Sequence, residues 1–102
     1  MFKNSNELLD YAIREIQVAV KKKKSKVEIV LMKQCASNSR RIKRCCNNLE
    51  IEKNTHVLNE KFKDYDIKGN VKLEKIGTLT RLKSGQIEFT YPLTWILVLR
   101  KK

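Results

Sequence analysis

Apolar residues between positions 5 and 22 recur at intervals of three and four, the spacing that places side chains on one face of an α-helix. Asn4 is a favourable N-cap for this helix, and Glu7 follows three residues later, as in a capping box. We therefore predict an amphipathic helix over residues 5–22, whose apolar stripe consists of Leu8, Leu9, Ala12, Ile13, Ile16, Ala19 and Val20.

Residues 26–33 have the alternation of a β-strand. Val27, Ile29 and Leu31 share one face, and Val30 and Met32 give the other face apolar character as well. Strands that are apolar on both faces are typical of central positions in a sheet. We therefore expect this segment to be a central strand.

A second helix is predicted over residues 38–49, with Ser37 or Ser39 as its cap. Its apolar positions fall at i, i+3, i+4 and i+7, and they are Ile42, Cys45, Cys46 and Leu49. The remaining faces carry four cations, named here the arginine-rich cluster, which consists of Arg40, Arg41, Lys43 and Arg44.

The pattern is weaker between residues 49 and 70. Residues 49–52 can form a short strand, and Asn54 or Thr55 can cap a third helix. Gly69 is placed to end that helix as a left-handed residue. The apolar positions of this helix would be Leu58, Phe62 and Tyr65.

The chain has β character from Val71 onward. Ser84 and Gly85 form a two-residue turn signal between alternating runs. Counting outward from this turn places Arg81 opposite Glu88, an opposite-charge pair that favours the register.

Pro92 marks an edge or a bulge, and residues 93–99 are the most apolar run, predicted to be a buried strand. These elements predict a single α+β domain over residues 1–102, in which about three helices pack on a mixed sheet with a C-terminal β-hairpin. Residues 5–31 and 55–75 both indicate a helix followed by a strand. Two weakly similar helix–strand motifs with a binding groove between them are an open alternative.

Composition excludes several classes of protein. The 102 residues are 41% hydrophobic with 3 Gly and 1 Pro, which is too apolar for an intrinsically disordered chain. No apolar run approaches the roughly 20 residues that span a bilayer, so we expect no membrane insertion. The first residues lack the apolar region of a secretory signal, and we expect an intracellular protein.

The net charge of +12 predicts an acidic partner, such as nucleic acid, an anionic membrane surface or an acidic protein. A lysine run, Lys21, Lys22, Lys23 and Lys24, follows the first helix, where cations complement the helix dipole without any ligand. The arginine-rich cluster lies in a segment without acids, between Met32 and Leu49. Both clusters are candidate sites for the phosphate groups of nucleic acid.

Three cysteines, Cys35, Cys45 and Cys46, favour a reducing compartment, because their number is odd and no C-x-x-C spacing occurs. His56 completes a set of four potential zinc ligands. Vicinal cysteines on a helix point about 100° apart, which suits one ion poorly. We therefore predict buried thiols and no metal site.

No nucleophile motif and no glycine-rich phosphate loop is present, and we expect neither an enzyme nor a bound cofactor. A small metal-dependent nuclease remains an alternative. It would use Asp66 and Lys68 with Asp64 and Glu60 nearby, although these residues are also consistent with an exposed helix end.

In its length, its richness in Lys, Asn and Ile, its lack of repeats and its N-terminal helix, the chain resembles the short orphan proteins of filamentous viruses that infect hyperthermophilic archaea. The resemblance covers the whole chain and carries over no functional residue. It implies the cytoplasm of a host cell as the compartment, where disulfides are tolerated.

The sequence favours a non-enzymatic binding module that takes a protein or peptide through a sheet edge or a groove between the motifs. Tyr91 and Trp95 are the candidate peptide anchors, although Trp95 is also a candidate for the core. The alternative is a nucleic-acid-binding protein without base-specific readout.

Overall fold

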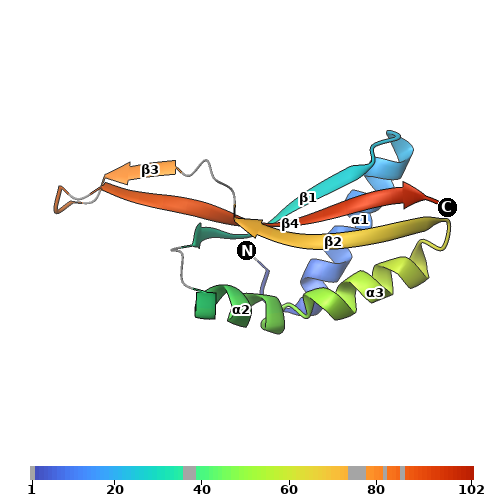
Figure 1. The fold of residues 1–102 in the computed structure, drawn as a ribbon, viewed down its shortest axis with the longest axis horizontal. Coiled ribbons are helices and arrows are strands. Elements are labelled where there is room, and N and C mark those ends of the chain that lie inside the picture. Colours follow the sequence, from blue (N-terminus) through green and yellow to red (C-terminus); the bar gives the residue numbers. More distant parts are fainter. Residues whose placement is uncertain (1, 36–38, 74–77, 82, 86) are drawn as a thin grey trace.

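The computed structural model describes residues 2–35, 39–73, 78–81, 83–85 and 87–102, and confirms the α+β class. Three helices lie on one face of an antiparallel sheet (Figure 1). In chain order the elements are α1 (Ser5–Lys21), β1 (Lys26–Cys35), α2 (Ser39–Asn48), α3 (Ile51–Lys61), β2 (Tyr65–Leu73), β3 (Thr78–Arg81) and β4 (Ile87–Lys101).

The strand β4 is the centre of the sheet. It pairs with β1 on one side and with β2 on the other, and its first residues, Ile87–Thr90, pair with β3. All of these pairs are antiparallel, so the expectation of a mixed sheet was wrong. The expectation that β1 is central was also wrong, because β1 pairs with β4 alone among the described strands and Val30 is 41% exposed.

Pro92 lies where β4 changes partners. The β2 ladder ends at Leu93, and the β3 ladder begins at Thr90. Opposite Pro92 the register of β1 shifts between Met32 and Cys35, so of the two predicted alternatives, an edge or a bulge, the structure has a bulge, whose extra residue lies in β1. Beyond it the β3–β4 hairpin projects away from the helices, and the molecule is 52 Å long (Figure 1).

The hairpin register differs from the prediction by one residue. Arg81 pairs with Ile87 and Thr80 with Glu88, so the expected pairing of Arg81 with Glu88 does not form. An odd number of residues therefore separates the strands, and Gly85 has a φ of 85°. The register therefore requires a turn longer than the two residues expected, and Gly85 supplies a positive φ within it.

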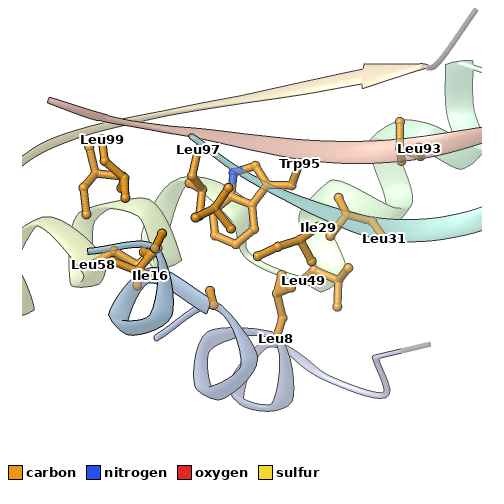
Figure 2. Close-up of a cluster of buried hydrophobic side chains, with 14 residues drawn as sticks. Leu8, Ile16, Ile29, Leu31, Leu49, Leu58, Leu93, Trp95, Leu97 and Leu99 are labelled. Carbon is orange, nitrogen blue, oxygen red and sulfur yellow. The ribbon is translucent and has the colours of Figure 1, made fainter. Parts of the chain in front are cut away.

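The helix α1 confirms the predicted amphipathic helix. The Asn4 side chain accepts a hydrogen bond from the N–H of Glu7 (2.9 Å), as an N-cap does. The most buried positions lie toward one side of the predicted stripe, and they are Leu8, Ala12, Ile16 and Ala19. These side chains meet the inward row of β4, which consists of Leu93, Trp95, Leu97 and Leu99 (Figure 2).

The segment between α2 and α3 corrects two predictions. Residues 49–52 form no strand, because Glu50 adopts a left-handed conformation (φ 49°) and α3 begins at Ile51. The buried side chain of Asn54 donates to the carbonyl oxygens of Leu49 (2.9 Å) and Ser5 (3.2 Å), and so ties α3 to the start of α1. Gly69 lies within β2 and does not end a helix.

The expected order of a helix followed by a strand is present in both segments, and the two units flank the central strand β4. One unit is α1–β1 and the other is α3–β2, and both strands run antiparallel to β4. Their helices pack against each other. A groove lined by Gly69, Asn70 and Val71 lies along the outer side of β2 and not between the two units.

Candidate functional site

The outer edge of β2 is closed at one point by a side chain. The Oδ1 atom of Asn59 accepts from the N–H of Ile67 (2.7 Å), and its Nδ2 atom donates to the carbonyl of Ile67 (2.9 Å). Asn59 also donates to the carbonyl of Thr55 (3.2 Å), which holds it on α3. The amide thus occupies the place that a neighbouring strand would take.

The same edge is open two residues further along. Backbone groups of alternate residues point the same way in an antiparallel strand, so those of Gly69 and Val71 face outward like those of Ile67. Within the described residues, no hydrogen bond satisfies these outward groups of Gly69 or Val71. They are available to an added strand.

A groove of about 560 Å³ runs beside this open edge. Its other wall is the junction of α2 and α3, where Glu50 is paired with Lys53 (3.2 Å). The groove residues are Cys46, Asn47, Glu50, Ile51, Glu52, Lys53, Gly69, Asn70 and Val71. Partial burial here raises the pKa of the Cys46 thiol above its ordinary value.

The indole of Trp95 lies beneath the groove. Trp95 is fully buried, and its Nε1 atom has no hydrogen-bond partner among the described residues (Figure 2). A Cβ atom at Gly69 would lie 2.7 Å from that nitrogen and 3.0 Å from the Oγ1 of Thr55. A glycine is therefore needed at this point of β2, because the indole occupies the space of a side chain.

The outer edge of β1 is protected differently. Because the N–H of Leu99 donates to the carbonyl of Ser25 (2.7 Å), the backbone groups of Lys26, Glu28 and Val30 face outward. Lys26 and Glu28 form an ion pair (3.0 Å), and register shifts follow Val30. Charged side chains and bulges are features that discourage pairing with another strand.

Trp95, one of the two peptide anchors predicted from the sequence, is not exposed at the groove surface. Trp95 belongs to the core, the alternative that we expected for it, and a peptide cannot contact its buried ring directly. The side chain of Tyr91 lies outside the described part of the structure.

The two basic clusters lie apart. The lysine run follows the end of α1, near the start of β1, whereas α2 contacts the far end of β1 and the N-terminal residues. Ten residues of strand separate these places by about 30 Å. Arg40, Lys43 and Arg44 are exposed, and the side chain of Arg41 is not described.

The potential metal ligands are dispersed. His56 is exposed on α3 and its Nε2 lies 3.1 Å from the Oε1 of Glu60, while Cys45 packs against the core. Cys35 has no described side chain. Among the described residues no three His, Cys, Asp or Glu side chains come together as a metal site would require, so neither zinc nor the nuclease alternative gains support.

None of the helices that the structure describes is both long and apolar enough to cross a membrane. Comparison of the chain with protein-family models, with curated proteins and with solved structures finds no match. The resemblance to proteins of archaeal viruses therefore stays a prediction.

Sequence reasoning missed the β2 edge and the role of Asn59. The signal was present in part, since Gly69 was identified as a special position but was assigned to a helix end. A glycine among alternating residues indicates a close approach of other groups to a strand.

Proposed function

We propose that this protein is a binding module that takes an extended peptide segment as an additional strand on the outer edge of β2, at Gly69 and Val71. The observation that carries the proposal is the contrast along one edge. Asn59 satisfies the backbone of Ile67, while the outward groups two and four residues later open into a groove. Backbone hydrogen bonds would supply the affinity of such a complex.

Gly69 supports a preference for one kind of side chain. A residue of the added strand that lies opposite Gly69 meets no Cβ atom, and its side chain can lie over the glycine backbone, above the buried indole of Trp95. A large side chain on the peptide fills this space best, as aromatic residues do opposite glycines in other sheets.

The proposal is tested by selecting binders from a displayed library of random ten-residue peptides against the whole protein. We expect bound peptides to shift the backbone amide resonances of Gly69 and Val71 and the indole N–H resonance of Trp95, the single tryptophan. Shifts confined to residues of β1, or a failure to select any peptide, would overturn the proposal.

A matched pair of variants locates the binding edge. Val71→Pro and Val30→Pro each remove one outward N–H from an edge strand and leave the ladder to β4 intact. We expect Val71→Pro to lower the affinity at least tenfold and Val30→Pro to leave it unchanged. Equal affinity of the two variants would contradict binding at β2, and circular dichroism shows whether each remains folded.

A further inference from the structure

Three segments that are distant in the sequence bring ten cations to one end of the molecule. The N–H of Leu99 bonds to the carbonyl of Ser25 (2.7 Å), and the N–H of Lys102 bonds to the carbonyl of Asp64 (2.9 Å). These contacts join the end of β4 to the turn after α1 and to the turn after α3, at the right of Figure 1. We call this region the basic end, and its cations are Lys21, Lys22, Lys23, Lys24, Lys26, Lys61, Lys63, Arg100, Lys101 and Lys102.

The positive charge of the basic end is largely uncompensated. Glu60, Asp64 and Asp66 are the acids within the same segments, and Glu60 already faces His56. All ten cations are exposed. Among the ten cations, only Lys26 forms an ion pair with another described residue, and its partner is Glu28. Since like charges repel one another, an anionic partner would stabilise this arrangement.

A cleft of about 500 Å³ lies in the middle of the basic end. Lys23 and Lys24 come from one side of it, and Lys101 comes from the central strand. Polar groups of Ser25 and Tyr65 add hydrogen-bond donors between these cations. The complete lining is Val20, Lys23, Lys24, Ser25, Tyr65, Leu99 and Lys101.

The conformation of Lys23 provides a second observation. Lys23 has a φ of 58° directly after α1, and the N–H of Lys24 bonds back to the carbonyl of Ala19 (2.8 Å). Glycine is the usual residue at this position of a helix end. The helix dipole accounts for cations at Lys21 and Lys22 but gives no reason for a lysine in place of a glycine here.

We propose that the basic end binds the phosphate backbone of nucleic acid, with the cleft lined by Lys23, Lys24 and Lys101 holding phosphate groups. Nine of the ten cations are lysines, which act on phosphates as point charges. Contacts of this kind position a nucleic acid without reading its bases. Binding is therefore independent of base sequence and decreases steeply as the salt concentration rises.

The surroundings of the cleft favour nucleic acid over a membrane surface. Interfacial binding buries a continuous apolar face among the lipids. The exposed apolar residues nearest the basic end are Val18 and Val98, at 47% each. Val18 lies on α1 and Val98 on the open face of the sheet, so they belong to opposite layers of the fold.

The proposal is tested by measuring the binding of labelled mixed-sequence 20-nucleotide single strands and 20-base-pair duplexes over a range of salt concentrations. A triple variant, K23Q/K24Q/K101Q, removes the cations of the cleft. Its matched control, R40Q/K43Q/R44Q, removes the same charge from the arginine-rich cluster on α2. We expect at least a tenfold loss for the first variant, with a salt slope lowered by about 2–3, and less than a threefold loss for the control.

The outcomes separate this site from its alternatives. Equal losses for both variants would show that net charge alone acts, and a loss confined to the control would place the site on α2. Binding to phosphatidylserine vesicles without binding to nucleic acid would identify a membrane surface instead. Each of these results, or an absence of binding at low salt, overturns the proposal. Val71→Pro, which tests the peptide groove, should leave nucleic-acid binding unchanged.

Discussion

The side-chain amide of Asn59 hydrogen-bonds to both backbone groups of Ile67, through Oδ1 at 2.7 Å and Nδ2 at 2.9 Å. A helix thereby supplies the donor and the acceptor that the next strand of a sheet would supply. This contact divides the edge of β2 into a closed part and an open part, and the peptide proposal depends on that division.

We predict that Asn59→Ala destabilises the fold by about 3 kcal/mol, because three partly buried hydrogen bonds of about 1 kcal/mol each are lost. The variant also leaves the edge of β2 open along more of its length, so we expect it to self-associate at high concentration. Denaturant unfolding and sedimentation velocity measure the two effects. Asn6→Ala, at an exposed position of α1, is the control, and similar values for both variants would contradict the role of Asn59.

We predict that Gly69→Ala destabilises the protein by about 1–3 kcal/mol, since the added methyl group overpacks the site against Trp95. Gly85→Ala is an informative comparison. Open space surrounds Gly85, so an added methyl group makes no contact there. Any loss of stability in Gly85→Ala arises from the positive φ of this residue. Fluorescence of the single tryptophan should therefore change in Gly69→Ala and stay constant in Gly85→Ala. An unaltered tryptophan spectrum in Gly69→Ala would contradict the packing of the indole against the glycine.

Lys23→Gly is expected to stabilise the fold by about 0.5–1 kcal/mol, because glycine adopts the left-handed conformation without steric cost. The same variant is expected to weaken nucleic-acid binding, since it removes a cation from the cleft. Lys22→Gly removes the same charge from a residue with a φ of −88°, and we expect no gain in stability there. Thermal unfolding and the salt-dependent binding measurement together distinguish the two contributions.

The raised pKa of Cys46 predicts slow alkylation. Burial disfavours the thiolate, so a smaller fraction of Cys46 is ionised at pH 8 than in the unfolded chain, and its reaction with iodoacetamide should be slower in the folded protein. Mass spectrometry of the modified peptide measures the rate, with the protein in concentrated guanidinium as the reference. Because Cys46 lines the groove, a bound peptide should slow the reaction further. Equal rates in the folded and unfolded protein would contradict the effect of burial.

The helices show how far local pattern reasoning extends. The bounds of α1 and its Asn4 cap follow from contacts within about four residues, and the same is true of the apolar stripe of α2. The wrong predictions of a mixed sheet and of a central β1 have a different origin. Apolar residues on both faces of β1 indicate a central strand, yet the helices cover one face only, and which strand lies in the middle depends on β4, some 60 residues later.

Gly69 illustrates the same limit at a single residue. Glycine is favoured both at a helix end and in a strand against which an indole packs, and the neighbouring residues in the sequence do not distinguish the two cases. Only the pairing of Gly69 with Leu97 and the approach of Trp95 identify the second reason.

The sequence by itself determined the α+β class, the helices α1 and α2 and the strongly basic character, since these depend on local spacing and on composition. Only the tertiary structure decided where the charge gathers and which edge is open. The end of α1 explains the lysine run in part. The run lies beside Lys101 because β4 runs antiparallel between β1 and β2. The edge of β2 is open at Gly69 and Val71 because Asn59 on α3 hydrogen-bonds to Ile67 alone among the residues of this edge that the structure describes. Such contacts depend on the packing of α3 against β2, and local periodicity does not predict them.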